Sequence, residues 1–243
     1  MEWVGLRNFI RLSQDKLFFQ SILNTLKFLI IHIPLQIVVA LLLAVLLNQK
    51  IKARGFFRAV YFLPVIVSGV VITLLWRQLY AYDSGLLNTL LTKLGLSRIP
   101  WITHPDWAMP SIAIMATWKN VGLYIVLFLV GLQGIPRYLY EAAEIDGARP
   151  VQQFFFITLP ALNSTIVLVI ILSTIGGFSL FIEPFVMTGG GPVNSTLSAM
   201  LYIYNQAFYF GHMGYAATLG FFFAVIVLII VLIQKKLVEQ KDT

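Results

Sequence analysis

The feature that most limits the fold of this chain is a series of long apolar stretches. They cover residues 18–47, 56–79, 108–132, 161–187 and 214–233. A helix needs about 20 mostly apolar residues to cross a bilayer. Only 11% of the residues are charged, whereas soluble domains carry about a quarter. The scarcity of charge therefore predicts that lipid is the solvent for much of the surface.

Backbone polar groups in lipid must find their hydrogen bonds within the protein, which favours helices. We therefore expect an all-α, polytopic transmembrane bundle of about five spanning helices. The transmembrane domain would cover residues 18–236, between an N-terminal segment 1–17 and a tail 237–243. The chain has no cysteine, so disulfide scaffolds and thiolate metal sites are excluded.

The positions of lysine and arginine predict the orientation. The loop 48–58 and the C-terminal end carry basic residues and few acids, namely Lys50, Lys52, Arg54, Arg58, Lys235, Lys236 and Lys241. Because basic loops stay inside, both should be cytoplasmic, as should the loop 133–160, while segment 1–17 is extracytoplasmic. An outside N-terminus without a signal is unusual, so we expect that one earlier helix is missing; the alternative is a family member that works with five helices. The net charge of +7 forms no long basic block, which argues against nucleic acid as a partner.

The loop 133–160 predicts two short helices with a tight bend. Pro136 suits the first turn of a helix, Gly147 suits its left-handed C′ position, and Pro150 can open a second helix. Helical spacing places apolar residues on one face of each helix: Leu139, Ala142 and Ala143 on the first, and Val151, Phe154, Phe155 and Leu159 on the second, opposite Gln152 and Gln153. The pair could rest on lipid headgroups, but the carboxylates of Glu141 and Glu144 favour a basic protein partner over anionic lipid.

A signature in this loop resembles a known family. Its residues are Glu141, Ala142, Ala143, Gly147, Ile157, Leu159 and Pro160. They resemble, at the family's spacing, the EAA loop of binding-protein-dependent ABC importer permeases. The resemblance implies that the loop is a coupling helix that sits in a cleft of the ATPase subunit. Glu141 would pair with an arginine of that ATPase, and Gly147 would provide the bend.

The resemblance covers essentially the whole chain. Within the family, the chain is similar to the carbohydrate-type branch, which includes maltose and glycerol-phosphate permeases. The positions that carry it are Phe57, Arg58, 62–64, Trp76, 85–88, Trp101, 188–192 and Thr196. It implies a transport subunit without enzymatic activity or cofactor, in the inner membrane of a prokaryote. The implied partners are a second, different permease subunit, two copies of an ATPase that bind ATP and Mg²⁺, and an extracytoplasmic solute-binding protein. The implied substrate is a sugar or oligosaccharide, with a glycerol-phosphate-like solute as the alternative.

Polar residues within the apolar stretches are candidates for a substrate pathway. A charge inside the membrane costs roughly 2.5 kcal/mol or more, so Lys119 should face a cavity or a partner unless it snorkels to the boundary. The candidates are Trp118, Lys119, Asn120 and Tyr124 in the third stretch, and Ser173, Gly176, Gly177 and Leu180 on one face of the fourth. The small residues of the fourth stretch fit a helix-packing seam equally well. In maltose-type relatives, the resemblance implies that these two helices line the transport site.

Several other functions fit the residues less well. His32 stands alone, without the spacing of a metal site, so we interpret it as structural. The turn 189–192 lacks the Lys-Ser/Thr of a phosphate loop, and no nucleophile and base suggest a catalytic site. Glu183 ends the fourth stretch, where it is expected to snorkel outward. A self-contained secondary transporter would need buried carboxylates for its ion, and the interiors of the stretches hold none.

Overall fold

The computed structural model describes residues 4–49 and 54–239, and every regular element in those ranges is helical. The expected all-α fold is therefore confirmed. Lys50, Lys52 and Lys241, which entered the prediction of orientation, lie outside the described residues.

Within residues 4–49 and 54–239, three helices are long and apolar enough to cross a membrane. They are α2 (Lys16–Asn48), α6 (Pro105–Gln133) and α13 (Met213–Glu239). They match the first, third and fifth apolar stretches. Pro34 lies inside α2 and Pro110 inside α6, and neither ends its helix.

The second and fourth stretches are broken. The helices α3 (Arg54–Ile66) and α4 (Gly69–Leu79) meet at 98°, and the segment before α10 (Asn163–Phe178) meets it at 64°. The fourth stretch was predicted over 161–187, but α10 stops at Phe178 and residues 182–187 form the separate helix α11 (Ile182–Met187). A hydropathy window averages over some 20 residues, so it cannot detect such breaks. The described part of the chain thus has three candidate spans, or up to five if each bent pair is one span.

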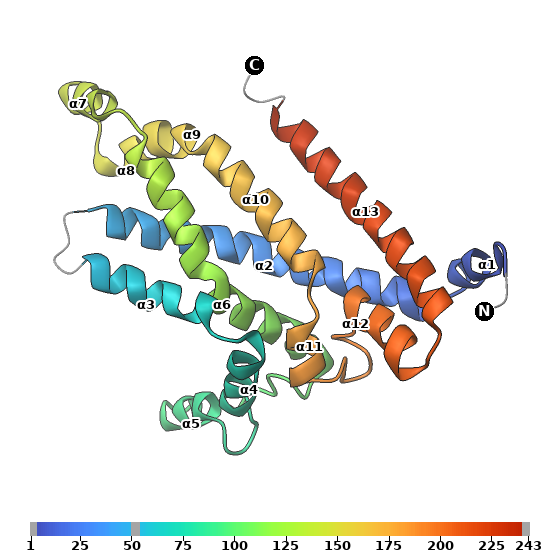
Figure 1. The fold of residues 1–243 in the computed structure, drawn as a ribbon. Coiled ribbons are helices and arrows are strands. Elements are labelled where there is room, and N and C mark those ends of the chain that lie inside the picture. The colour runs from blue at the N-terminus through green and yellow to red at the C-terminus, as the bar shows by residue number, and fades with distance from the viewer. Residues whose placement is uncertain (1–3, 50–53, 240–243) are drawn as a thin grey trace. The chain divides into compact units, whose positions relative to one another are not determined.

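The chain divides into two compact units. The first comprises Met1–His32, Val67–Ala116 and Thr174–Thr243. Its further helices are α1 (Arg7–Ser13), α5 (Leu86–Lys93), α12 (Ala199–Tyr204) and the π-helix η2 (Asn205–Tyr209). Within it α11 packs against α4, and the helices α1, α12 and η2 all pack against α13 (Figure 1).

A carboxylate ties three segments of this unit together. Asp15 accepts hydrogen bonds at Oδ2 from the hydroxyls of Tyr202 and Tyr215, both at 2.6 Å, and at Oδ1 from the Phe18 amide at 3.0 Å. Burial raises the pKa of Asp15, but the hydrogen bonds from these donors and the Leu17 amide outweigh it, so the pKa lies below its usual value. Asp15 therefore joins the start of α2 to α12 and α13.

The second unit comprises Ile33–Ile66 and Thr117–Ser173. Its core packs small residues against large ones, with Ala40 and Ala44 of α2 fully buried in the same cluster as Phe128 of α6. A Cβ atom on Gly122 of α6 would collide with the carbonyl oxygen of Tyr61 on α3. The backbones of α3 and α6 thus approach closely, and only glycine fits at this position.

Candidate functional site

The helix α7 (Arg137–Ile145) opens the loop between α6 and α10 and is followed by its C-cap residue Asp146 and by Gly147. Gly147 adopts φ of +76°. Its amide donates to the carbonyl of Glu144 at 3.1 Å, and the Ala148 amide donates to the carbonyl of Ala143 at 2.8 Å. This is the Schellman pairing, in which a glycine in the left-handed region satisfies the last carbonyls of a helix. The predicted bend at Gly147 is confirmed.

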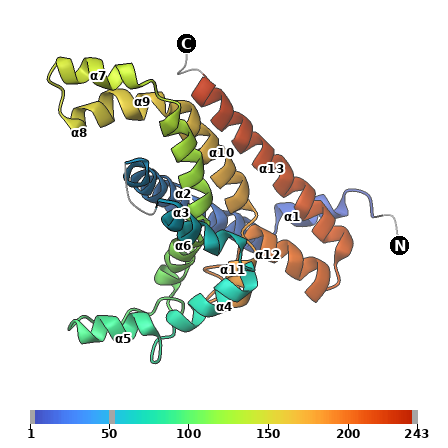
Figure 2. The same ribbon diagram turned by 60° about the vertical axis from the view of Figure 1, so that its left-hand side comes forward.

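The second half of the loop begins with α8 (Pro150–Gln153), as Pro150 predicted. The Gln152 side chain accepts a hydrogen bond from the Arg149 amide at 2.8 Å, which caps this helix. The chain continues through the π-helix η1 (Phe154–Thr158) and α9 (Leu159–Ala161). The Tyr140 hydroxyl of α7 lies 2.8 Å from the Thr158 hydroxyl, so one hydrogen bond joins the two halves, which run side by side in Figure 2.

The predicted apolar face of the second helix is wrong in part. Phe154 and Leu159 pack against the core of the second unit, whereas Val151 and Phe155 are exposed. A π-helix advances fewer degrees per residue than an α-helix, so η1 breaks the spacing from which one shared face was predicted. Gln153, expected on the polar face, donates instead to the carbonyl of Ala148 at 3.2 Å.

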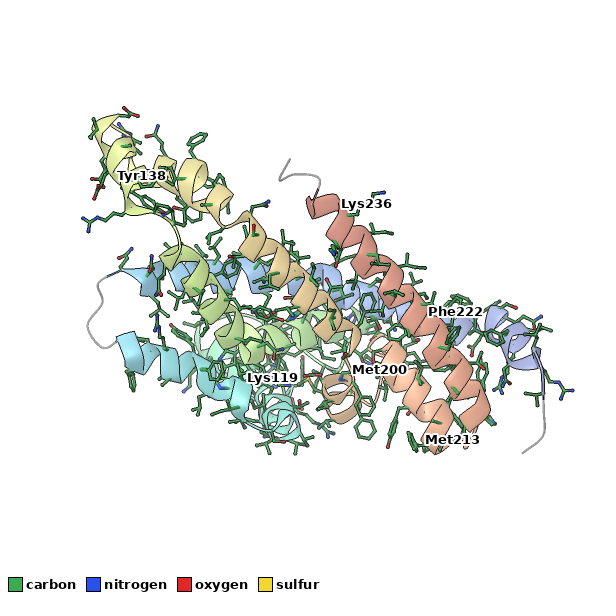
Figure 3. The ribbon with its side chains drawn as sticks, turned by 45° about the horizontal axis from the view of Figure 1, so that its top comes forward. Lys119, Tyr138, Met200, Met213, Phe222 and Lys236 are labelled. Atoms are coloured by element: carbon green, nitrogen blue, oxygen red, sulfur yellow. The ribbon has the colours of Figure 1, made fainter. Side chains whose placement is uncertain are left out.

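The signature residues lie on an exposed loop surface. Glu141 and Ala142 are exposed, Ala143, Ile157 and Leu159 are half-buried, and Pro160 is exposed. The Glu141 carboxylate lies 2.9 Å from the Arg137 guanidinium, one turn earlier. Large apolar side chains also face outward, with Ile145 87% and Phe156 78% exposed. Tyr138 of α7, labelled in Figure 3, is exposed as well. Such a mixture of apolar and charged side chains suits a protein partner.

The predicted pathway residues are divided between the units. Trp118, Lys119, Asn120 and Tyr124 on α6 and Ser173 on α10 belong to the second unit, whereas Gly176, Gly177 and Leu180 belong to the first. Tyr124 and Ser173 are buried, Trp118 is exposed, and Lys119 (Figure 3) and Asn120 are half-buried. Their place in a substrate pathway stays a prediction.

One of the small-residue positions, Gly177, has a packing role. A Cβ on Gly177 would collide with the Leu29 side chain of α2, whereas a Cβ on Gly176 would meet nothing within 4 Å. The carbonyl of Leu180 accepts a hydrogen bond from the Ser198 hydroxyl at 2.6 Å. Glu183 is buried, so the prediction that it snorkels outward is wrong.

The match to a family model decides the identity of the chain. Residues 17–241 match the model described as binding-protein-dependent transport system inner membrane component. The chain belongs to this family. It is therefore a multi-pass membrane protein and a permease subunit of an ABC importer, as the EAA resemblance implied.

Named relatives agree with the family. The probable ABC transporter permease protein YurN of Bacillus subtilis is 37% identical over 96% of this chain and 82% of its own length. The lactose transport system permease protein LacF of Rhizobium radiobacter is 38% identical over 96% of this chain and 80% of its own length. In a crystal structure of a bacterial ABC transporter that imports the acidic polysaccharide alginate, one chain is 25% identical and superposes with a TM-score of 0.84. That likeness covers 99% of this permease and 85% of the other chain.

Some of the contacts that hold these segments could not be found from the sequence. Asn24 of α2 donates to the carbonyls of Asn194 at 2.7 Å and Leu197 at 3.0 Å, which holds the turn after α11. The Thr188 and Thr196 hydroxyls, 2.7 Å apart, close the same turn. The threonines belong to the segment singled out by resemblance, but no local pattern pairs Asn24 with residues some 170 positions later.

Proposed function

We propose that this permease imports a sugar or oligosaccharide and that its loop 133–160 docks onto a separate ATPase subunit. The observation that carries the proposal is the family match together with the exposed, sharply bent loop that bears the EAA signature. Relatives named for lactose, arabinooligosaccharides and trehalose or maltose support a sugar over a glycerol-phosphate-like solute.

The working assembly would contain a second permease subunit, two ATPase copies that bind ATP and Mg²⁺, and an extracytoplasmic solute-binding protein. A solved alginate transporter in complex with a pentasaccharide-bound periplasmic protein supports the last of these. The protein would lie in the inner membrane of a prokaryote, with the loop 133–160 in the cytoplasm and the turn 188–196 outside.

ATP binding would close the ATPase pair and pull the two coupling loops together. The hydrogen bond between Tyr140 and Thr158 would transmit this movement from α7 to the segment that leads into α10. The helices would then alternate between inward-facing and outward-facing arrangements around the sugar. ATP and the loaded binding protein can drive this switch only through their different affinities for the two states.

The pathway would be lined by two groups of residues. They are Trp118, Lys119, Asn120 and Tyr124 of α6, and Ser173, Gly176 and Gly177 of α10 with Leu180 two residues after its end. Indole and phenol rings can stack on a sugar ring, and the amide and ammonium groups can bind its hydroxyls. No side chain of this set is proposed as catalytic.

Charge reversal at Glu141 tests the docking. In the reconstituted importer, Glu141→Lys should lower both sugar uptake and substrate-stimulated ATP hydrolysis by an order of magnitude or more, because it replaces a carboxylate that would pair with a basic ATPase residue. Arg137→Ala removes the pair within α7 and should leave both activities near wild type, since an exposed pair contributes only about 0.3–0.5 kcal/mol. Wild-type uptake and ATP hydrolysis in Glu141→Lys would exclude the docking role.

A further inference from the structure

A pocket of about 260 Å³ lies in the first unit beside α12 and η2. The residues that line it come from the connection between α10 and α11, from α12 and from η2: Phe181, Met200, Ile203, Tyr204, Ala207 and Phe208. None of these lining side chains is charged, and the Tyr204 hydroxyl is their only polar side-chain group. A sugar site needs several converging polar groups beside its aromatic rings. The pocket therefore suits an apolar ligand rather than the transported sugar.

Aromatic rings build the walls of this pocket. The rings of Phe181 and Phe185 stack with centroids 5.3 Å apart, the Tyr204 ring lies 5.0 Å from that of Phe181, and the Phe208 ring lies 5.1 Å from that of Tyr204. The π-helical turn η2 closes with a hydrogen bond from the Phe210 amide to the Asn205 carbonyl at 2.9 Å. Short π-helical turns occur frequently at functional sites.

The surface around the pocket is apolar and exposed. Phe208 is 67% and Tyr209 80% exposed, and Phe210 is also exposed. Contact of such a surface with water is unfavourable, because apolar area is stabilised when it leaves water. An apolar occupant would remove that cost.

The pocket lies where the chain enters a membrane span. The turn η2 ends at Tyr209, and α13 begins at Met213. Both α12 and η2 pack against α13. Figure 3 labels Met200 on α12 and Met213 at the start of α13. Only 22% of the spanning window of α13 is buried, so most of this apolar helix is left exposed beside the elements that line the pocket. Aromatic side chains gather at the membrane–water interface, which fits this junction. In the proposed orientation the junction lies in the outer leaflet.

We propose that the pocket holds one acyl chain of an outer-leaflet phospholipid. The chain would contact Phe181, which lies in the break between α10, ending at Phe178, and α11, beginning at Ile182. An occupied pocket would therefore hold this break in one conformation, directly after Leu180 of the proposed pathway. The effect of the lipid on transport rests on the proposed function, whereas binding of the lipid does not.

A photoreactive lipid tests the binding. The complete importer is placed in nanodiscs that contain a phospholipid with a diazirine in its acyl chain, and the labelled peptides are identified by mass spectrometry. We expect labelling of residues 199–209 as well as of α13. Met200→Trp should fill the pocket and reduce labelling of 199–209 several-fold, with labelling of α13 unchanged. Met213→Trp, the same substitution outside the lining, should change neither.

Two results would overturn the proposal. One is labelling of 199–209 that Met200→Trp leaves unchanged. The other is absence of labelling at 199–209 because the partner permease covers the pocket. Cross-linking between the two permeases would show that the pocket is covered. Met200→Gln, which keeps the side-chain length and introduces an amide, should also reduce labelling and provides the test if the tryptophan variant does not fold. Failure of the wild-type importer to take up any sugar would contradict the proposed function while leaving the labelling result valid.

Discussion

Asp15 is a single carboxylate whose ionisation should affect stability. Its pKa lies below the usual value because the hydrogen bonds it accepts outweigh its burial. A carboxyl group with a lowered pKa stabilises the fold above its unfolded pKa, about 3.9, and this contribution is lost as the pH falls through the folded pKa. At neutral pH we therefore expect Asp15→Asn to unfold at a lower temperature than wild type. The difference should shrink as the pH falls below about 4, in thermal unfolding of the detergent-solubilised protein.

Tyr202 and Tyr215, which donate hydrogen bonds to Asp15, provide a separate test of this carboxylate's contribution. Tyr202→Phe and Tyr215→Phe each remove one 2.6 Å hydrogen bond to Oδ2. Each should lower the free energy of unfolding by about 1.5–3 kcal/mol, the usual contribution of a hydrogen bond to a charged group. A difference between Asp15→Asn and wild type that is the same at every pH would show that the charge of Asp15 has no part in stability.

Two glycines with the same φ allow backbone strain to be separated from coupling to the ATPase. Gly147 and Gly95 both have φ of +76°, and a Cβ on either would meet nothing within 4 Å. Alanine in this region costs about 1–2 kcal/mol, so Gly147→Ala and Gly95→Ala should destabilise the protein to a similar extent. Only Gly147→Ala should also lower substrate-stimulated ATP hydrolysis, measured in the reconstituted importer. An equal loss of hydrolysis in both variants would attribute the effect to stability alone.

Gly147 and Asp15 differ in whether their roles depend on neighbouring or on distant residues, and this decides whether the sequence can predict them. The role of Gly147 is local, since a glycine after an amphipathic helical run indicates a C′ position. The role of Asp15 depends on Tyr202 and Tyr215, which follow some 190 positions later. Contacts of that range follow from tertiary packing, which no pattern in one sequence specifies.

Between helices, the hydrogen bond from Tyr140 to Thr158 joins the two halves of the coupling loop. Tyr140→Phe removes the hydroxyl and keeps the ring. We expect a loss of about 1 kcal/mol in the local stability of the loop, with the membrane core unchanged. The number of sugars imported per ATP hydrolysed should therefore fall, as measured by parallel uptake and phosphate-release assays. Tyr138→Phe is the matched control, because Tyr138 is an exposed tyrosine of the same helix. Equal behaviour of the two variants would contradict a role for the hydrogen bond.

The helices show how far hydropathy can predict elements. Apolar length located α2, α6 and α13 to within a few residues, because an uninterrupted span needs little more than length and composition. The breaks between α3 and α4 and before α10 depend on backbone angles at a few positions, such as the extended ψ of 126° at Ser68. The π-helix η1 is likewise invisible to a 3.6-residue period, which is why that period places Phe155 on the wrong face.

For the whole molecule, the energy source separates an ABC permease from a self-contained transporter. Within the described ranges, Glu183 is the only buried carboxylate, and an ion-coupled transporter would need such a group in its membrane region. We expect proteoliposomes that contain this chain alone to show no sugar uptake under a proton or sodium gradient. Uptake should require the partner permease, the ATPase, the binding protein and ATP, and it should persist when the gradients are collapsed. Gradient-driven uptake by the chain alone that Glu183→Gln abolishes would contradict the assignment. The docking loop and the proposed sugar pathway lie on the same chain. ATP dependence of uptake would therefore show in a single measurement that docking of the ATPase is coupled to movement of the sugar.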